Sequence, residues 1–299
     1  MNTVKLSSQF DDLQLSVAYC EPKSEAKAIF QIVHGMAEHK ERYYPFMEYL
    51  SEQGYICLIH DHRGHGESIK APEDLGYMYK GGAQALVEDV KKVQDWAKEK
   101  FPGLEVYLFG HSMGSMVVRA FTKKYDSSIA KLIVCGCPSD NPAKGAGLAL
   151  ASIIGLLKGE RHRSNFLNHL AFGSYNKGLE ADNPLAWLSA NRQNTIDYYK
   201  DPLCGFVFTV NGFKNLFRIM KECYSAKAWS VANPGLKIKF ISGGDDPCRI
   251  SDKACLKAVK FLKDRGYSEV QSQLYPGLRH ELLLEGKKEV WDDVAAFIK

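Results

Sequence analysis

The stretch Glu105-Val-Tyr-Leu-Phe-Gly-His-Ser-Met-Gly114 decides the fold. Residues 105–109 form an apolar run typical of a buried strand, and the pentapeptide Gly110-His-Ser-Met-Gly114 then opens a helix expected over 113–125. A serine between a strand and a helix is held on a sharp turn with its hydroxyl above the sheet, and the flanking glycines let the two elements pack closely. Ser112 is therefore the candidate nucleophile. The alternative is an ordinary turn with a serine that caps the helix.

Short apolar runs alternate with helix-like segments on both sides of this motif. Strands that are apolar on both faces indicate a buried, mostly parallel sheet with helices on both faces, so we predict an α/β fold. Two runs with alternating polarity near the N-terminus indicate a hairpin. The expected strands are 4–8, 13–19, 28–33, 55–59, 105–109, 130–137, 237–242 and 270–275, and the expected core helices are 43–53, 83–100, 113–125, 250–265 and one from about 287.

The segment from residue 138 to about 234 breaks the alternation. It is helix-like, has no clear strand and is rich in Asn, Gly and aromatic residues. A long block between two strands of one sheet is typical of an insertion, and open α/β sheets bind ligands at the carboxyl edge of their strands. We therefore predict a core made of residues 1–137 and 233–299, with residues 138–232 inserted as a helical cap over that edge.

A serine hydroxyl needs a base to become a nucleophile, and that base is commonly histidine. Where the serine lies on this kind of turn, the order along the chain is serine, then Asp or Glu, then histidine. Three histidines follow Ser112, and His162 and His169 fall in the predicted cap. His280 follows the last expected strand, where a loop can reach the nucleophile, so His280 is the candidate base. A packed histidine without a catalytic role is the alternative.

The acid that orients the histidine should follow the penultimate strand. Ser242-Gly-Gly-Asp-Asp-Pro247 offers two adjacent aspartates there, and neighbouring side chains point in different directions. We favour Asp246, with Asp245 as the alternative. The acid would hold the imidazole tautomer and stabilise its charged form.

An oxyanion in the transition state needs two fixed backbone donors. The N–H of Met113, the residue after the serine, is one candidate. The turn His34-Gly-Met-Ala-Glu-His39 follows the first core strand, and its glycine allows a close approach. We expect the N–H of Met36 to be the second donor.

These motifs together resemble a known family. His34-Gly-Met-Ala-Glu-His39 with Arg42-Tyr43, Asp61-His-Arg-Gly-His-Gly-Glu-Ser68, Gly110-His-Ser-Met-Gly114, Gly244-Asp-Asp246 and His280 are similar to the monoacylglycerol lipase and lysophospholipase branch of the α/β-hydrolases, often grouped with serine aminopeptidase-like (S33-type) hydrolases. The likeness covers the core, about two thirds of the chain, and in the cap only segments such as Tyr198-Tyr-Lys-Asp-Pro-Leu203. It implies a triad of Ser112, Asp246 and His280, with the N–H groups of Met36 and Met113 as the oxyanion hole.

Two groups of residues are possible metal ligands. His60-Asp-His-Arg-Gly-His65 holds three histidines, but its order differs from the metallohydrolase motif that it partly resembles. Cys135 and Cys137 lack a second pair at zinc-finger spacing. We expect the eight cysteines to be reduced thiols packed as small apolar groups, and we expect no metal and no organic cofactor.

The predicted cap contains an apolar stretch, residues 145–157, beside basic residues 158, 161 and 163. This helix could line an acyl-chain pocket or contact an anionic membrane surface, and packing on its neighbours is the alternative. The phenylalanines at 206, 208, 213 and 217 favour the cap's own core over an apolar tunnel.

Charge and composition narrow the partners and the location. Basic and acidic residues are mixed, 39 against 35, with a net charge of +4, which does not favour nucleic-acid binding. No secretion signal or run of 18 apolar residues is evident, so a cytoplasmic location is expected.

The sequence thus predicts a serine hydrolase that cleaves carboxylic esters through an acyl-enzyme. The resemblance implies a small lipid-derived ester as substrate, such as a monoacylglycerol or a lysophospholipid. The alternatives are an aminopeptidase-type hydrolase, which would need cap carboxylates such as Glu160, Glu180 or Asp182 near the pocket, and a small aryl-ester hydrolase on the same residues.

Overall fold

A computed structural model describes residues 1–180 and 182–299. In these residues eight strands form one sheet in the order β1-β2-β4-β3-β5-β6-β7-β8. β1 pairs antiparallel with β2 and β2 antiparallel with β4, whereas the other neighbours are parallel. The expected α/β fold with a mostly parallel sheet is confirmed. The strands are β1 Asn2–Ser7, β2 Gln14–Cys20, β3 Ala28–Val33, β4 Tyr55–His60, β5 Val106–His111, β6 Lys131–Cys135, β7 Lys237–Gly243 and β8 Val270–Tyr275.

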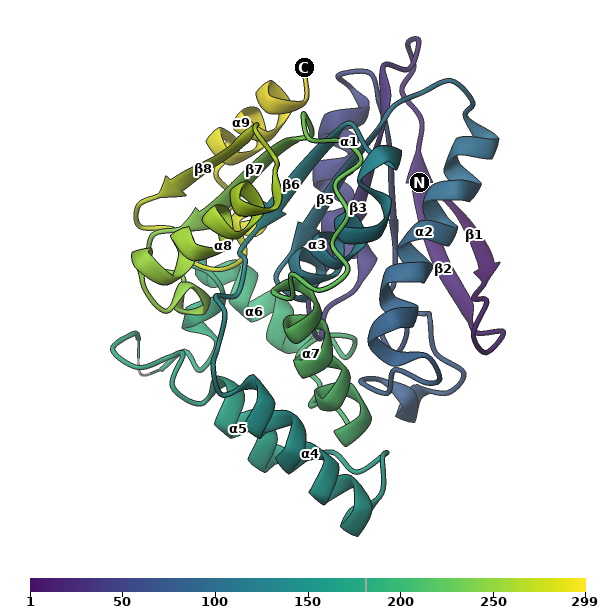
Figure 1. Cartoon of the computed structure of the whole chain (residues 1–299). Coiled ribbons are helices and arrows are strands. Elements are labelled where there is room, and N and C mark those ends of the chain that lie inside the picture. The colour runs from purple at the N-terminus through teal and green to yellow at the C-terminus, as the bar shows by residue number, and fades with distance from the viewer. Residues whose placement is uncertain (181) are drawn as a thin grey trace.

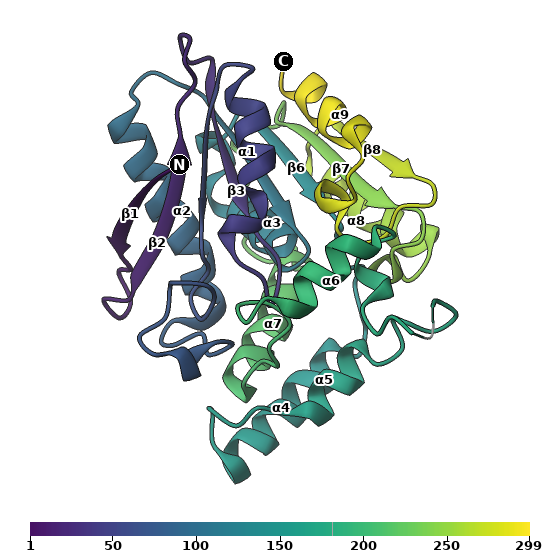
Figure 2. The ribbon, with the colours of Figure 1, turned by 180° about the vertical axis from the view of Figure 1, so that it is seen from behind.

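Helices cover both faces of this sheet. Figure 1 shows α2, α3 and α8 in front of the strands, and the reverse view in Figure 2 shows α1 and α9 on the other face. Two apolar clusters correspond to these layers, one on each side of the sheet. The helices are α1 Tyr44–Ser51, α2 Gly82–Lys100, α3 Met113–Tyr125, α4 Lys144–Lys158, α5 Asn165–Phe172, α6 Arg192–Lys200, α7 Val210–Cys223, α8 Asp252–Arg265 and α9 Lys288–Ile298.

The apolar pattern of the sequence explains these layers. All six residues of β3, of β4 and of β5 are buried, as expected for strands covered on both faces. In α2 the buried Leu86, Val90, Val93 and Ala97 recur at helical spacing and form the face that packs on the sheet. α8 begins at Asp252, two residues later than expected. The reason is that Ile250 has φ 60°, which a helix does not accept, and Ser251 then caps the helix.

The chain between β6 and β7 holds α4, α5, α6 and α7. In the described part of this segment no residue belongs to a strand, although Arg163 and Thr209 form one isolated bridge. α4 packs against α7, and α7 packs in turn against α2 and α3. Figure 1 places α4 and α5 beyond the lower end of the sheet. The exact division into a core and a cap at residues 138 and 232 stays a prediction.

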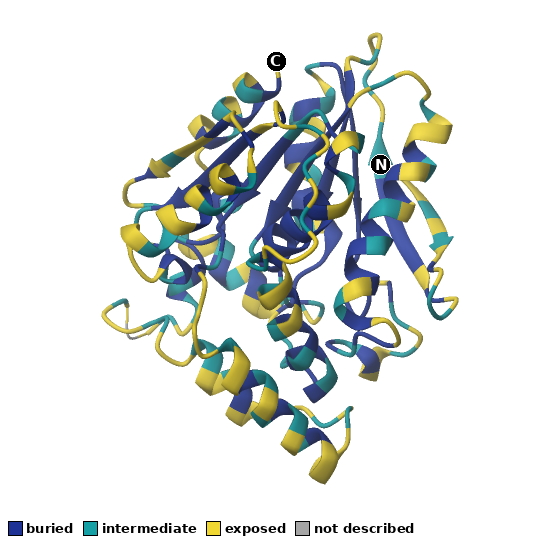
Figure 3. Ribbon diagram, in the orientation of Figure 1, coloured by how far each residue is buried: buried dark blue, intermediate teal, exposed yellow. Residues whose placement is uncertain are grey.

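The sheet and the helices α4 and α5 differ in how far their residues are buried. Figure 3 shows buried strands in the sheet and largely exposed outer surfaces on α4 and α5. Several large apolar side chains of these two helices are exposed. Among the described residues, no helix combines the length and the apolar character needed to cross a bilayer.

Candidate active site

Ser112 lies on a strained turn between β5 and α3. Its backbone has φ 52° and ψ −116°, which is uncommon for a residue with a side chain and is held here by the surrounding packing. A Cβ atom on Gly110 would lie 2.5 Å from the carbonyl oxygen of Gly114, and one on Gly114 would collide with the carbonyl oxygen of Val33. The two glycines of the motif are therefore required by close backbone contacts.

The three residues favoured for the triad are brought together. Ser112 Oγ lies 2.8 Å from His280 Nε2, and His280 Nδ1 lies 2.9 Å from Asp246 Oδ2. Since a carboxylate can only accept, Nδ1 carries the hydrogen, and in the neutral ring Nε2 is then free to accept from the serine hydroxyl. The other carboxylate oxygen of Asp246 accepts from the N–H of Cys248 at 2.8 Å, which fixes the carboxylate.

Burial and charge set the protonation of this pair. Burial disfavours the imidazolium form of His280, but the adjacent Asp246 carboxylate outweighs burial and raises the pKa of His280 well above its ordinary value. Burial likewise disfavours the Asp246 carboxylate, yet the interaction with His280 and the bond from Cys248 lower the pKa of Asp246. The carboxylate is therefore ionised at neutral pH and can stabilise a positive charge on the imidazole.

The alternatives for acid and base occupy other positions. Asp245 donates its backbone N–H to Leu278 O, and no hydrogen bond joins its carboxylate to His280 in the described residues. His162 follows α4, and His169 lies on α5. His169 lines the cavity described below but makes no hydrogen bond with Ser112.

Met36 and Met113 line the same cavity as Ser112, and Met113 is the next residue along the chain. Within the described chain, neither of their backbone N–H groups donates a hydrogen bond. A hydrogen bond within the turn stabilises the backbone around Met36: the N–H of Gly35 donates to Glu38 Oε1 at 2.6 Å. The next residue, Ala37, has φ 53° and completes this tight turn.

A buried ion network beneath this turn was not predicted from the sequence. Arg42 donates to Glu38 Oε2 at 2.6 Å and to both carboxylate oxygens of Glu281 at 2.7 Å. All three side chains are largely buried. Glu38 lies in the turn 34–39 and Glu281 follows His280, so position alone could have marked these two residues, but not their contact with Arg42. The network ties the turn after β3 to the loop that carries His280.

Two aromatic side chains support the base from other elements. His111 Nε2 donates to the carbonyl oxygen of His280 at 3.1 Å, and its Nδ1 faces Tyr43 and Glu38. Trp187, from the segment between β6 and β7, lies with its ring centroid 5.2 Å from that of His280. No sequence pattern distinguishes Trp187 from other aromatic residues of the segment, since only the tertiary fold brings it to the loop after β8.

A cavity of about 640 Å³ opens over Ser112 and His280. Most of its lining comes from the segment between β6 and β7 and is apolar, including Leu150 of α4 and Phe172 of α5. The four phenylalanines of this region divide between two roles. The four phenylalanines were expected to form a core, and residues 208 and 213, which are fully buried, do so, whereas residues 206 and 217 line the cavity.

The histidines at 60, 62 and 65 pack inside the core. They are buried, and burial lowers the pKa of His60 and of His65 to about 4, so both rings are neutral. The N–H of His62 donates to His34 Nε2 at 2.9 Å, which joins the turn after β4 to that after β3. Among the described residues, these three histidines do not form a group with metal-ligand spacing. All eight cysteines are free thiols.

The chain belongs to the family described as serine aminopeptidase, S33, whose model matches residues 24–287. It is 26% identical to a monoacylglycerol lipase of Mycolicibacterium smegmatis over 93% of this chain and 90% of the relative. It is 31% identical to the monoglyceride lipase of Mus musculus over 91% of this chain and 81% of the relative. A carboxyl esterase from Bacillus coagulans, solved with glycerol, superimposes with a TM-score of 0.86 at 23% identity and covers 99% of this chain and 96% of its own. This last likeness supports the α/β-hydrolase fold.

Proposed function

We propose that this member of the S33 family hydrolyses esters of monoacylglycerol or lysophospholipid type through an acyl-enzyme on Ser112. In this proposal His280 is the general base and acid, and Asp246 orients and stabilises its imidazole. The N–H groups of Met36 and Met113 bind the oxyanion. The chain is a carboxylic ester hydrolase with the α/β-hydrolase fold, as its family and its relatives indicate.

One observation carries the proposal. A serine on a strained turn, a histidine and a buried aspartate are joined by hydrogen bonds of 2.8 and 2.9 Å at the floor of an apolar cavity. A nucleophile bonded to a base that is in turn oriented by a carboxylate is the arrangement that activates a hydroxyl. The backbone N–H groups of Met36 and Met113 make no hydrogen bond in the described chain and line the same cavity, so they are available as the donors that acyl transfer requires.

The chemical steps follow from this geometry. Ser112 Oγ attacks the ester carbonyl while His280 Nε2 takes the hydroxyl proton. The carbonyl oxygen becomes an oxyanion and accepts from the N–H groups of Met36 and Met113. When the tetrahedral intermediate collapses, the alcohol leaves with the proton from His280, and the acyl group stays on Ser112. Water activated by His280 then attacks the acyl-enzyme, and the acid and free enzyme are released.

The size and lining of the cavity support a lipid-derived acyl group. A volume of about 640 Å³ lies within the range that accommodates ligands well beyond a small aryl ester. Leu150, Phe206 and Phe217 provide apolar walls, so burial of an acyl chain is favourable by about 0.8 kcal/mol per CH₂ group.

The charges of the cavity favour an ester over an aminoacyl amide. A substrate with a free ammonium group would need an available carboxylate, yet Glu160, Glu180 and Asp182 are each paired with a basic side chain. In the described lining, the carboxylates are Glu38 and Glu281, and both are held by Arg42. An aminopeptidase substrate would have to displace that buried arginine.

Exposed apolar side chains on α4 and α5 support contact with a lipid surface. Leu156, Leu157 and Phe166 are among the most exposed large apolar residues, and the basic Lys158 follows directly. Such a combination suits an interface with anionic lipid. We propose that α4 and α5 contact the membrane or micelle from which the lipid substrate enters the cavity.

The test is a substrate panel with purified protein. It contains p-nitrophenyl esters of two to sixteen carbons, monoacylglycerols, lysophosphatidylcholine and aminoacyl p-nitroanilides, with Ser112→Ala as control. We expect the highest kcat/KM for a glycerol or glycerophospho ester of a medium or long acid, and loss of that activity in the control. Preferential cleavage of aminoacyl anilides, or of acetyl esters alone, would replace the proposed substrate class.

A further inference from the structure

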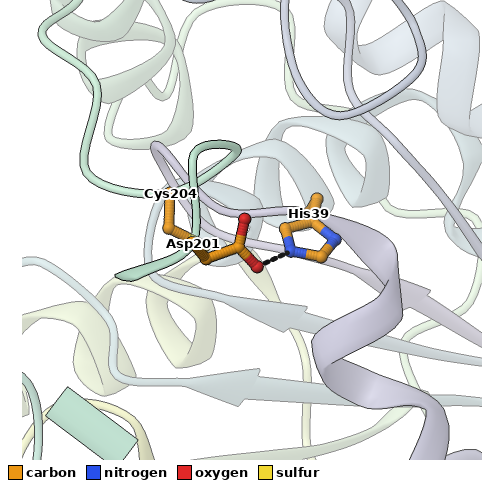
Figure 4. Close-up of side chains that lie close together, drawn as sticks. All are labelled: His39, Asp201 and Cys204. Carbon is orange, nitrogen blue, oxygen red and sulfur yellow. Dashed lines mark hydrogen bonds and ion pairs between the residues drawn. The ribbon is translucent and has the colours of Figure 1, made fainter. Parts of the chain in front are cut away.

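The loop after β3 and the segment after α6 bring three potential metal ligands together. His39 Nε2 lies 2.8 Å from Asp201 Oδ2, and Figure 4 shows Cys204 beside this pair. One donor atom from each of the three residues lies within 4.8 Å of the other two. His39 and Cys204 are buried, whereas the Asp201 carboxylate is partly exposed and gives a small ion access from solvent.

We propose that His39, Asp201 and Cys204 form a zinc-binding site that links the core to the cap. Imidazole and thiolate ligands favour zinc over magnesium or calcium, and three protein ligands with one water complete a tetrahedron. Metal–ligand bonds of about 2.0–2.3 Å place tetrahedral ligands about 3.5 Å apart. Ligand atoms already within 4.8 Å of one another reach this spacing by small side-chain movements.

The surroundings of the three residues orient two of them in advance. Asp201 Oδ1 accepts from the N–H of Leu203 at 2.8 Å, which leaves Oδ2 directed at His39. Cys204 is a free thiol with no hydrogen bond in the described residues, so a metal would not have to displace a partner from the sulfur.

The same surroundings limit the affinity. Burial raises the pKa of the Cys204 thiol, although the nearby Arg42 opposes this, so zinc must displace a proton that is released to solvent. His39 Nδ1 is buried and has no hydrogen-bond partner in the described chain. Metal-bound histidines usually have such a partner, and its loss costs about 10–100-fold in affinity. We therefore expect a dissociation constant on the order of micromolar.

The position of the site gives zinc a structural effect. The carbonyl oxygen of Ala37 accepts from the Tyr198 hydroxyl and from the N–H of Gly205, each at 2.9 Å. These bonds already attach α6 and the segment after it to the turn that carries Met36. Zinc would add a third link at the same junction and raise the melting temperature. The site includes none of the residues proposed for the triad, so it does not depend on the proposed function.

The experiment measures zinc binding to the full chain by competition with a chromogenic chelator. Wild-type protein is compared with Cys204→Ala, which removes one ligand but leaves the bond between His39 and Asp201. Cys20→Ala is the control, because Cys20 is a free, half-buried thiol on β2 that is not part of the group. Cys248→Ala controls for zinc bound at Asp246, Cys248 and His280, the other group of three donors at this spacing in the described residues.

We expect one equivalent of zinc to bind and to raise the melting temperature of the wild-type protein. Affinity should fall at least tenfold in Cys204→Ala and stay within twofold in Cys20→Ala and Cys248→Ala. Cobalt in place of zinc should give a thiolate-to-metal charge-transfer band that Cys204→Ala abolishes, which a merely destabilised variant would not explain. The proposal is overturned if Cys204→Ala binds zinc as wild type does, if only Cys248→Ala loses binding, or if no saturable binding occurs.

Discussion

The carboxyl edge of the sheet and the outer helices α4 and α5 are built in opposite ways. At the sheet edge, Ser112, His280 and Asp246 are joined by short hydrogen bonds, and the last two are almost fully buried. On α4, Leu156 and Leu157 are 88% and 79% exposed, although leucine normally packs inside. In the proposed function, the chemistry takes place at the hydrogen-bonded edge of the sheet, whereas substrate delivery depends on apolar side chains of α4 and α5 that this chain leaves exposed.

The largest expected effect is a loss of kcat on substitution of Asp246 at the carboxyl edge of the sheet. Asp246→Asn should lower kcat by about 10⁴-fold, because the amide no longer holds the required tautomer or stabilises the imidazolium. The adjacent Asp245→Asn is the matched control and should change kcat less than threefold. Steady-state kinetics with a p-nitrophenyl ester measure both variants, and circular dichroism checks their fold. Equal losses in the two variants would contradict the assignment of Asp246.

The pH dependence of kcat/KM tests whether His280 is the base. His280 must be neutral to accept the serine proton, and its pKa is raised by the Asp246 carboxylate despite burial. Activity should therefore be lost as pH falls through that pKa, by about tenfold per unit on the acidic limb of kcat/KM. The midpoint of the limb should lie above the ordinary value of 6.5. A pH–rate profile with a midpoint at or below 6.5 would show that another group controls the limb.

A substitution inside the cavity tests whether the apolar lining selects the acyl chain. Leu150→Trp fills space in the cavity, so kcat/KM for long-chain esters should fall about tenfold while that for p-nitrophenyl acetate stays within twofold. Ile153→Trp changes an exposed position on the same helix and should leave both substrates unaffected. A uniform loss for all chain lengths in Leu150→Trp would indicate damage to the fold instead of the pocket.

The smallest effect concerns the exposed surface. The double variant Leu156→Glu/Leu157→Glu should reduce hydrolysis of a monoacylglycerol presented in anionic vesicles by about three- to tenfold, because two apolar side chains no longer enter the interface. Hydrolysis of soluble p-nitrophenyl acetate should not change. Leu256→Glu on α8 is the matched control, since Leu256 is also exposed. A wild-type rate on vesicles in the double variant would remove the proposed contact with lipid.

The core of this molecule could be predicted from sequence because local signals and burial agree there. The apolar runs of β3, β4 and β5 need partners on both faces, and the motif at Ser112 needs a strand before it and a helix after it. The choice between Asp245 and Asp246 was harder, because adjacent residues share one local sequence. Only the direction of the Asp246 side chain toward His280 separates them.

The cap and the network around the site could not be predicted in the same way. Phe206 and Phe208 are close in sequence and chemically identical, yet one lines the cavity and the other is buried. Arg42 joins Glu281 across most of the chain, and no local pattern encodes such a contact. Both depend on how distant elements pack, which periodicity does not report.

Whether Ser112 carries the acyl group is tested most directly by mass spectrometry of the intact protein, quenched during turnover of a p-nitrophenyl ester. We expect a mass increase equal to the acyl group, located by digestion on the peptide that carries Ser112 and absent from Ser112→Ala. A wild-type protein that turns over with the acyl group on another residue, or a Ser112→Ala protein that keeps wild-type activity, would contradict it.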